Sequence, residues 1–333
     1  MTCQHRMMRY VVMGAGAVGG VVGGRLHESG HDVVLVARGA HFEALRDHGL
    51  VLESPTDVVH LDVEVVDRPA ALTWRDPTVV FLSVKGQDTE EALDSLAAAA
   101  PPETAIVCLQ NGVENERRAL RRFAHTYGMC VMLPATHLRP GLVQAHNAPF
   151  NGLLDVGCYP SGLDEVAEEI AGALSASRFD AHAVPDVMRW KYRKLLKNLA
   201  NAVDSLCGVR TAGAFELVQM AQEEGEAVLA AAGVEVATPE EDDARRLVQS
   251  SLQPTASGPH QGGSSWQSVA RGTGRVEADF LNGEIALVGR LVGVPTPVNE
   301  LLQRLAGEAA ARGAAPGSYP LEELRQAVAH AAG

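Results

Sequence analysis

A short glycine-rich motif near the N-terminus constrains the fold of this chain more than any other feature. The motif follows an apolar run at residues 10–13 and precedes a segment of helical character; it consists of Gly14, Ala15, Gly16, Ala17, Val18 and Gly19. In this setting the first glycine makes a tight turn, the second lets the backbone approach a pyrophosphate, and the third allows close packing of helix on strand. The helix N-terminus also attracts an anion through its unpaired N–H groups. The motif predicts a dinucleotide site, although the glycines could also serve only a tight turn.

The end of the next apolar run, residues 33–36, indicates which dinucleotide is preferred. An acidic residue at this point typically accepts a hydrogen bond from the ribose 2′-hydroxyl of NAD. Here the run is followed by Ala37, Arg38 and Gly39. A guanidinium cannot accept that hydrogen bond, but its fork of donors suits a 2′-phosphate. Arg38 therefore predicts NADP(H), unless it is an exposed arginine that only solvates the end of the strand.

The chain changes character near residue 186. Before that point short apolar runs alternate with amphipathic segments, which is typical of a parallel sheet flanked by helices. The expected strands are residues 10–13, 33–36, 79–84 and 105–109, and the expected helices are 18–29, 40–48 and 89–99. Three later runs, at 129–136, 142–146 and 153–158, are expected to add antiparallel strands to the same sheet. Beyond residue 188 the pattern is helical throughout, so we predict an α/β domain at 8–185 and an all-helical domain at 186–333.

The composition excludes several classes of protein. The formal net charge of −13 repels nucleic acid and anionic membranes. No stretch reaches the ~20 uninterrupted apolar residues that span a bilayer, so we expect a soluble protein. The five cysteines include no C-x-x-C pair, which is typical of reduced thiols in the cytoplasm. We predict a cytoplasmic protein without a metal site.

Two further strand ends carry polar residues. Lys85 directly follows the run at 79–84, and Gln110, Asn111 and Gly112 follow the run at 105–109. Because ligands bind beside the carboxyl ends of parallel strands, Lys85 should point into the nucleotide crevice. An uncharged amide donor should likewise lie beside the nicotinamide. Each of these residues could equally be a plain turn residue.

The helical part carries two more candidate groups. Lys194, Asn198 and Asn201 stand at i, i+4 and i+7, so one helix face would carry an amine and two amides. A solvated stripe would explain the lysine, but it explains less well two asparagines, which are poor helix formers. Ser265 and Glu277 belong to a second polar cluster, which could instead be a helix N-cap and a charged helix face.

These segments, in this order and over nearly the whole chain, resemble the ketopantoate reductase family. The resemblance implies a Rossmann-type domain followed by a helical domain, often assembled as a homodimer. It also implies the NADPH-dependent reduction of a 2-oxoacid, with 2-dehydropantoate, an intermediate of pantothenate and coenzyme A biosynthesis, as the first candidate. The implied cofactor contacts are the glycine motif, Arg38 and Lys85, together with Asn111 and Glu277.

The resemblance implies roles in the reaction as well. Lys194 matches the catalytic lysine of the family and Glu277 its active-site carboxylate. Ser265 matches a contact to the substrate carboxylate, whereas Asn111 and Asn198 match residues that position substrate or nicotinamide. A positioned ammonium would stabilise the negative charge that develops on the carbonyl oxygen during hydride transfer, and it would donate the proton.

Two departures from the family pattern lie on the substrate side. The family usually carries its second helix asparagine eight residues after the lysine, whereas this chain has Asn201 at seven and Ala202 at eight. The usual acidic residue after the glutamine is replaced here, since Gln267 is followed by Ser268. These departures favour, as alternatives, a related 2-oxoacid or imine reductase of a specialised pathway. A non-catalytic NADPH-binding sensor is an alternative of another class.

Overall fold

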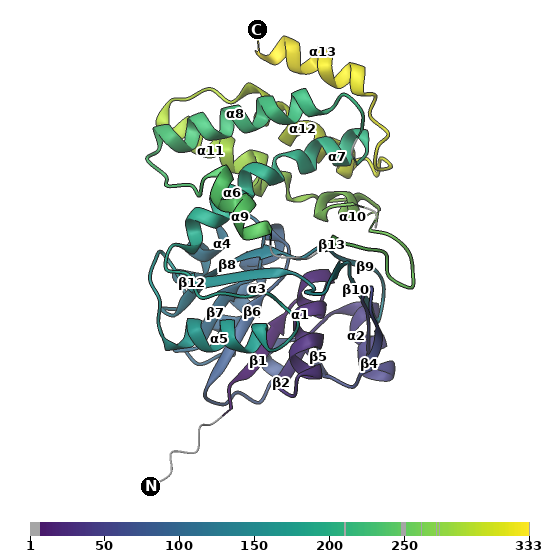
Figure 1. Cartoon of the computed structure of the whole chain (residues 1–333), viewed down its shortest axis with the longest axis vertical. Helices are drawn as coiled ribbons and strands as arrows, with labels where there is room; N and C mark the ends of the chain where they lie inside the picture. The colour runs from purple at the N-terminus through teal and green to yellow at the C-terminus, as the bar shows by residue number, and fades with distance from the viewer. Residues whose placement is uncertain are drawn as a thin grey trace. The chain divides into compact units, whose positions relative to one another are not determined.

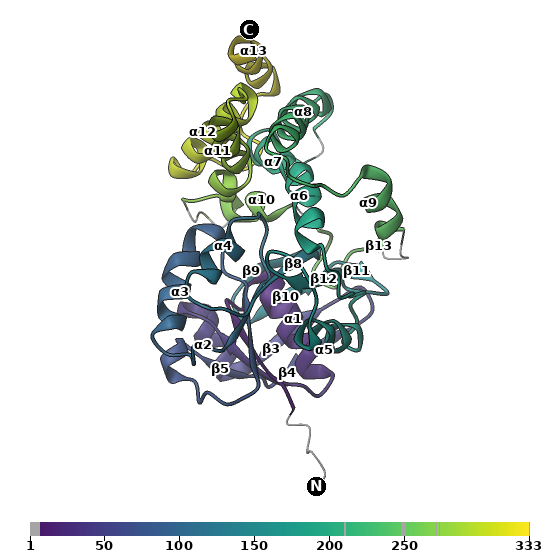
Figure 2. The ribbon, with the colours of Figure 1, turned by 90° about the vertical axis from the view of Figure 1, so that its left-hand side faces the viewer.

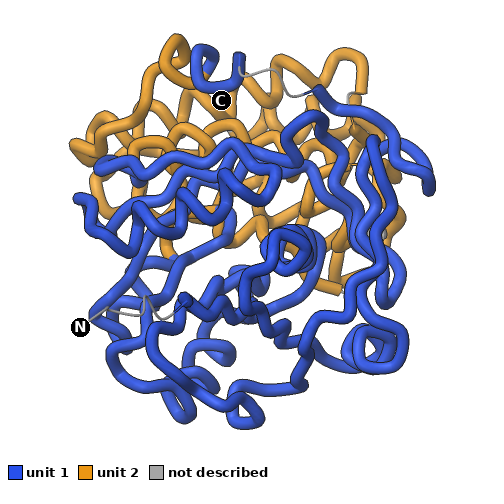
Figure 3. Tube along the Cα trace, turned by 60° about the horizontal axis from the view of Figure 1, so that its bottom comes forward, with its two compact units in different colours: residues 1–111, 115–188, 243–260 blue, residues 112–114, 189–242, 261–333 orange. Residues whose placement is uncertain are grey.

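The chain divides into two compact units, each of which is discontinuous in sequence. The computed structural model describes residues 7–209, 211–247, 251–260, 262–270, 272 and 274–332. Unit 1 comprises residues 1–111, 115–188 and 243–260, and unit 2 comprises residues 112–114, 189–242 and 261–333 (Figure 3). The sequence predicts two domains that are each continuous in the chain, at residues 8–185 and 186–333. That division stays a prediction.

The larger sheet of unit 1 has the strand order of a dinucleotide-binding fold. Among the described residues its seven strands run in the order β12-β8-β7-β6-β1-β2-β5 (Figure 1). The bounds are β1 (Arg9–Met13), β2 (Asp32–Val36), β5 (Glu64–Val66), β6 (Thr78–Leu82), β7 (Ala105–Cys108), β8 (Thr126–Met132) and β12 (Leu153–Cys158). All neighbouring pairs are parallel except β12 with β8. The order of the strands reverses between β1 and β6, which is where such sheets bind their ligands.

Alternate residues of the central strands build two separate cores. Val12 and Phe81 belong to one apolar cluster with residues of α1 and α5, whereas Val11 and Val80 belong to another with residues of α3. Figure 2 shows α1 and α5 on one side of this sheet and α3 on the other. The strands are therefore buried on both faces, which explains why they read as continuous apolar runs. The flanking helices are α1 (Ala17–Glu28), α2 (Gly39–His48), α3 (Thr89–Ala97), α4 (Asn115–Leu120) and α5 (Glu165–Ser175), with 3-10 turns η1 (Pro69–Ala71) and η2 (Gly86–Asp88).

A second sheet of unit 1 corrects one expectation. Its four strands, in the described part of the chain, run in the order β4-β3-β10-β9. The bounds are β3 (Leu50–Glu53), β4 (Val58–Leu61), β9 (Ala135–Arg139) and β10 (Leu142–Ala145), and a short strand β11 (Asn147–Ala148) follows. The runs at 129–136 and 142–146 were expected to extend the larger sheet in antiparallel fashion. That expectation was wrong for β9 and β10, which lie in the second sheet, and for β8, which is parallel to β7. It holds only for β12.

Helix α1 packs against both sheets through pairs of glycines. A Cβ atom at Gly23 would lie 2.6 Å from a methyl of Leu35 in the larger sheet. A Cβ atom at Gly20 would lie 2.7 Å from a methyl of Val143 in the second sheet. Because these distances are shorter than carbon atoms tolerate, larger side chains would force the helix away from the strands.

Unit 2 is helical because its sequence is rich in good helix formers. In the described residues the helices from residue 187 onward are α6 (Val187–Asn198), α7 (Ala200–Cys207), α8 (Phe215–Ala231), α9 (Pro239–Arg246), α10 (Ser264–Ala270), η3 (Glu277–Phe280), α11 (Asn282–Val292), α12 (Pro297–Ala311) and α13 (Leu321–Ala332). Their core includes Leu199, Val228, Ile285 and Leu302, all of which are fully buried. None of the described helices combines the length and the apolar character that a bilayer crossing needs.

A segment late in the chain packs with unit 1 rather than with the helices around it in sequence. Arg245 donates two hydrogen bonds to the buried carboxylate of Asp155. Strand β13 (Ser251–Leu252) pairs with β11, and the hydroxyl of Ser257 donates to Glu53 at 2.7 Å. The expectation that the chain is all helical beyond residue 188 was therefore wrong at β13.

A buried arginine joins α1 to the turn between β3 and β4. Arg25 is fully buried and donates to Asp57 at 2.8 Å and to Asn151 at 2.7 Å. Partial burial alone would raise the pKa of Asp57, but hydrogen bonds from Arg25 and Ser54 and the charge of Arg178 outweigh it. The pKa therefore falls from 3.8 to about 2.

We expect the stability of the protein to depend on the Asp57 charge. Since the folded-state pKa is lowered, its contribution of roughly 2 kcal/mol is present above about pH 4 and is lost as the pH falls toward 2. Urea unfolding should show Asp57→Asn destabilised at pH 7, with a difference from wild type that narrows below pH 4. Asp67→Asn serves as the control, because the ion pair of Asp67 among the described residues is a long contact with Arg68, at 3.7 Å. A difference that stays constant down to pH 2 would contradict this assignment.

Candidate functional site

The turn after β1 has a backbone that requires glycine. Gly14 has φ +104°, and its N–H and that of Ala15 both donate to the carbonyl of Val36 at 3.1 and 3.2 Å. A Cβ atom at Gly14 would lie 3.0 Å from the backbone of Ser83 and Val84. The loops that follow β1 and β6 are therefore in contact at the point where the strand order reverses.

The N-terminus of α1 has the properties of an anion site. Gly16 is its N-cap residue, no side chain caps the helix, and its first turn contains no acidic residue. The N–H groups at the start of such a helix have no partner within it, so a pyrophosphate is a suitable acceptor. A Cβ atom at Gly16 would meet no other atom of the described residues within 4 Å, whereas one at Gly19 would lie 2.2 Å from the Gly14 carbonyl oxygen. Gly16 thus borders open space, and Gly19 is in close contact.

Arg38 lies at the start of the helix that follows β2. It is the N-cap residue of α2, and its side chain is 57% exposed. One guanidinium nitrogen donates to the carboxylate of Glu91 in α3 at 2.6 Å. An exposed ion pair of this kind contributes little stability. The protein therefore loses little free energy when the guanidinium exchanges Glu91 for a phosphate.

The other two strand ends differ from each other. Lys85 follows β6 and is the N-cap residue of η2. Gln110 is buried, and its amide donates to the carbonyl of Val84 at 2.7 Å and to the hydroxyl of Thr89 at 3.0 Å. The Gln110 amide therefore ties β7 to the segment after β6. Of the two amides that follow β7, Gln110 and Asn111, Asn111 is therefore the candidate for a ligand contact.

The helix that carries the lysine and the two asparagines is divided by a tight turn at one residue, Leu199. The backbone of Leu199 stays in the helical region, with φ −60° and ψ −24°, but α6 ends at Asn198 and α7 begins at Ala200. The carbonyl of Leu199 accepts a hydrogen bond from the buried amide of Asn282 at 3.3 Å, and that of Leu196 accepts one from Gln222 at 3.2 Å. These side chains satisfy backbone groups at the junction. Lys194 and Asn198 are one turn apart on α6, whereas Asn201 belongs to α7.

The amide of Asn198 is a buried donor. Its Nδ2 atom is inaccessible to solvent and has no hydrogen-bond partner among the described residues. Leaving such a group unsatisfied costs about 1–3 kcal/mol, so its presence calls for an explanation. A bound oxygen atom of a ligand would satisfy it.

Unit 2 also brings Asn201 and Glu277 to the segment around α10. The side-chain Oδ1 atom of Asn201 lies only 3.3 Å from where a Cβ atom of Gly263 would be. The hydroxyl of Ser264 donates to the carboxylate of Glu277 at 3.1 Å. Ser265 and Glu277 are 3% and 4% exposed, so neither is part of a solvated helix face.

The departure at Ser268 has a structural explanation. Its hydroxyl donates to the Ser264 carbonyl at 3.0 Å, and the Gln267 amide donates to the Gly262 carbonyl at 3.1 Å. Both side chains are buried and support the start of α10. They therefore act on the segment that holds Ser265.

Two contacts in these regions had no signal in the sequence. The hydroxyl of Ser264 donates to the carboxylate of Glu277. The imidazole of His41 contacts the carbonyl of Ala15 at 2.7 Å. The two partners of each contact are 13 and 26 residues apart and follow no helical or strand period. Only the tertiary structure shows these pairs.

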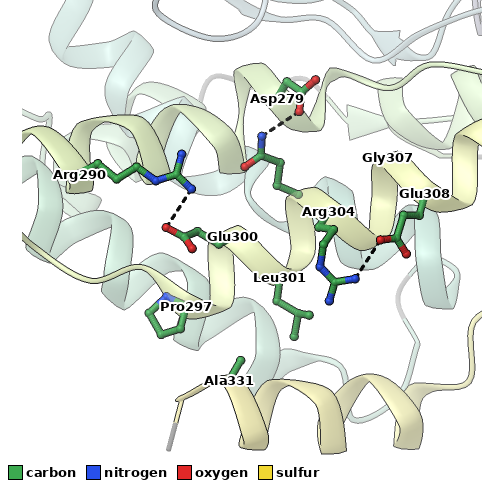
Figure 4. Close-up of a pocket in the computed structure, with 10 residues that line it drawn as sticks. Asp279, Arg290, Pro297, Glu300, Leu301, Arg304, Gly307, Glu308 and Ala331 are labelled. Carbon is green, nitrogen blue, oxygen red and sulfur yellow. Dashed lines mark hydrogen bonds and ion pairs between the residues drawn. The ribbon is translucent and has the colours of Figure 1, made fainter.

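A groove in unit 2 takes in none of the predicted site residues (Figure 4). Charged side chains of α11 and α12 line it and pair with one another. Arg290 pairs with Glu300 at 3.1 Å, and Arg304 pairs with Glu308 at 2.9 Å. We assign no function to this groove.

Comparison with known proteins places the chain in a family. The family model described as ketopantoate reductase PanE/ApbA matches residues 10–161, and the model of its C-terminal domain matches residues 186–310. The chain belongs to the ketopantoate reductase family. It is accordingly an oxidoreductase that acts on CH–OH groups, in a family that uses NADPH and reduces 2-oxoacids.

Individual relatives match over most of their length. The 2-dehydropantoate 2-reductase of Pyrococcus horikoshii is 29% identical over 90% of this chain and 96% of its own, and that of Archaeoglobus fulgidus is 30% identical over 90% and 97%. A ketopantoate reductase structure from Ralstonia eutropha is 28% identical, with a TM-score of 0.77 over 92% of this chain and 99% of that one. A D-mandelate dehydrogenase with NADH and anilino(oxo)acetate shares the fold, with a TM-score of 0.78 over 91% and 99% at 23% identity.

The surroundings of two glycines lead to a pair of contrasting expectations. Gly16→Ala should leave the thermal midpoint unchanged, because the added methyl enters open space, and should raise the Kd for NADPH about tenfold where a pyrophosphate would lie. Gly19→Ala should destabilise the protein by about 1–3 kcal/mol, because its methyl meets the Gly14 carbonyl. Thermal denaturation and NADPH fluorescence titration measure both. Normal NADPH binding by Gly16→Ala would contradict a nucleotide at this loop.

Proposed function

We propose that this protein reduces 2-dehydropantoate to pantoate with NADPH, as a step of pantothenate and coenzyme A biosynthesis. Membership of the ketopantoate reductase family and the names of its relatives support the substrate. The unsatisfied Asn198 amide, one helical turn from Lys194, is the observation that carries the assignment of the reacting groups. We further propose a cytoplasmic homodimer, as the family resemblance implies.

Unit 1 supplies the proposed nucleotide contacts. The N–H groups at the start of α1, from Ala17 and Val18, donate to the pyrophosphate, and Gly16 leaves the space it needs. Arg38 exchanges its Glu91 partner for the 2′-phosphate of NADPH. Lys85 and Asn111, which follow β6 and β7, contact the rest of the dinucleotide.

Unit 2 supplies the proposed groups for the reaction. When bound, the reduced nicotinamide supplies a hydride to the carbonyl carbon of the 2-oxoacid. The Lys194 ammonium stabilises the negative charge on the carbonyl oxygen and donates the proton that makes it a hydroxyl. The buried Glu277 carboxylate, held by Ser264, orients that ammonium or accepts from a substrate hydroxyl, and it also borders the cofactor. Asn198 donates to a ligand oxygen.

The substrate carboxylate is assigned to the segment around α10. Ser265 lies in that helix, and the side chains of Gln267 and Ser268 support its start. Asn201 lies against the backbone of Gly263, so we assign its amide a contact with the same part of the substrate. These neutral donors fix the orientation of the 2-oxoacid without adding charge.

A second candidate is the reduction of a different 2-oxoacid. The observation that favours it is the position of Asn201, which belongs to α7 and lies against Gly263 rather than on α6 with Lys194. A related fold serves a dehydrogenase of D-mandelate, whose oxidised form is an aromatic 2-oxoacid. The substrate pocket of this chain could therefore suit a side chain other than that of 2-dehydropantoate.

Replacement of Lys194 tests the proposed chemistry. Lys194→Met keeps most of the length of the unbranched side chain but removes the ammonium, so we expect kcat to fall by about 100-fold or more while the Kd for NADPH stays within about twofold. NADPH oxidation followed by absorbance, with 2-dehydropantoate and a panel of aliphatic and aromatic 2-oxoacids, measures both the variant and the preferred substrate. A wild-type protein that reduces other 2-oxoacids but not 2-dehydropantoate would favour the second candidate. Full activity of Lys194→Met would refute the role of the ammonium.

Arg38 and Glu91 test the choice of nucleotide. Arg38→Ala should weaken NADPH binding by about 10- to 100-fold and leave NADH binding nearly unchanged, because only NADPH carries the 2′-phosphate. Glu91→Gln should strengthen NADPH binding about two- to fivefold, because it removes a competing carboxylate. Fluorescence titration with both nucleotides gives the four dissociation constants. Equal weakening of NADPH and NADH by Arg38→Ala would show that Arg38 does not bind the phosphate.

A further inference from the structure

The imidazole of His41 is hydrogen-bonded on both of its nitrogen atoms. Nε2 lies 2.7 Å from the carbonyl oxygen of Ala15, inside the glycine-rich loop. Nδ1 accepts a hydrogen bond from the N–H of Gly141 at 3.0 Å. The ring also packs against that of His137, with 4.2 Å between centroids. His41 therefore touches the turn before α1 and the hairpin of the second sheet at once.

The partners of His41 determine which nitrogen carries the proton. A backbone N–H is always a donor, so Nδ1 must accept from Gly141 and carries no hydrogen. Nε2 is then the protonated nitrogen, and it donates to the carbonyl of Ala15. Burial lowers the pKa of His41, which agrees with a neutral ring. A second proton on Nδ1 would face a donor and break the Gly141 contact.

The Gly141 end of this bridge is firmly held. Gly141 is buried, has φ +77°, and accepts a hydrogen bond from the N–H of Val51 at 2.8 Å. Its neighbour in the hairpin, Leu142, accepts from Nδ1 of His137 at 3.0 Å. The hairpin is thus a fixed support on one side of the imidazole. The loop on the other side contains a glycine at each end, and glycine backbones are conformationally permissive.

His41 also stands close to the second part of the nucleotide grip. It lies in the first turn of α2, three residues after Arg38, the N-cap residue of that helix. The Ala15 contact therefore ties the start of α2 to the loop before α1. On the proposed function, these two segments bind the 2′-phosphate and the pyrophosphate of one molecule, so their separation must match the nucleotide.

We propose that His41 is a positioning residue for NADPH: its Nε2–H holds the Ala15 carbonyl so that the glycine-rich loop directs the N–H groups at the start of α1 to the pyrophosphate. This inference rests on the proposed function, because it assumes that the loop binds the nucleotide. His41 makes no contact with the ligand in this role. It restricts the loop before the nucleotide binds, so the loop loses less conformational entropy when the pyrophosphate binds.

Two substitutions separate this role from a purely structural one. The amide of His41→Asn falls near the place of Nδ1, so it can accept from Gly141 but cannot reach Ala15. The longer side chain of His41→Gln falls near the place of Nε2, so it can donate to Ala15 but not serve Gly141. Each variant loses one of the two hydrogen bonds, and thermal denaturation shows whether their stabilities match.

NADPH and NADH titrations of these variants test the proposal. We expect His41→Asn to raise both dissociation constants about three- to tenfold, because the pyrophosphate is common to both nucleotides, and His41→Gln to stay within about twofold of wild type. Equal affinities for the two variants would overturn the inference while leaving the proposed function intact. Failure of the wild-type protein to bind NADPH would instead overturn the proposed function, and the inference with it.

Nitrogen NMR of histidine-labelled protein gives a second measurement that does not depend on the folding of His41→Asn. The His41 signals are assigned by their loss in His41→Gln. We expect a protonated Nε2 and an unprotonated Nδ1 near neutral pH, and a change in the Nε2 signal when NADPH is added. A proton on Nδ1, or signals that NADPH does not change, would refute the proposed contact.

Discussion

The close approach of α1 to two sheets is the constraint on which the rest of unit 1 depends. Gly19 and Gly23 let the helix contact the larger sheet, and Gly20 allows the same contact with the second sheet. The helix can take up only one position between such close surfaces, since packed interiors leave no room for displacement. Its N-terminus is therefore fixed beside the ends of β1 and β6, where the sheet reverses its strand order. The proposed anion site follows from this packing rather than from any charged side chain of the helix.

Polar side chains organise the parts of the molecule that apolar packing leaves undefined. Gln110 joins the segments after two neighbouring strands, and Asn282 satisfies the backbone at the junction of α6 and α7. Both amides are buried and bond to carbonyl oxygens. The Asn198 amide resembles them in burial but has no partner among the residues that the structure describes. The contrast concerns the donor groups alone: the NH2 groups of Gln110 and Asn282 bond to the protein, and on the proposed function the NH2 group of Asn198 is left for a ligand.

The proposed division of labour between the two units follows from their different chemistry. Unit 1 offers backbone N–H groups and one exposed guanidinium, Arg38, which suit the phosphates of a dinucleotide. Unit 2 offers an amine, buried amides and a buried carboxylate, which suit the carbonyl and carboxylate of a small oxoacid. The family assignment is consistent with both sets. On the proposed function, Asn201 and Ser268 bear on the identity of the oxoacid, because they lie in or beside the segment that holds Ser265.

The sequence by itself determined the strand–glycine–helix motif, the parallel strands around it and the helical character of the later chain, because each of these leaves a local pattern of apolar or glycine residues. It also pointed to Arg38 and Lys194 by position. It could not show that β9 and β10 form a second sheet, since strand runs of similar composition can pair with many partners. Nor could it show that the helix ends at Asn198, that residues 243–260 return to unit 1, or that His41 bonds to Ala15. Those features depend on contacts between residues far apart in the chain, which only the tertiary structure decided.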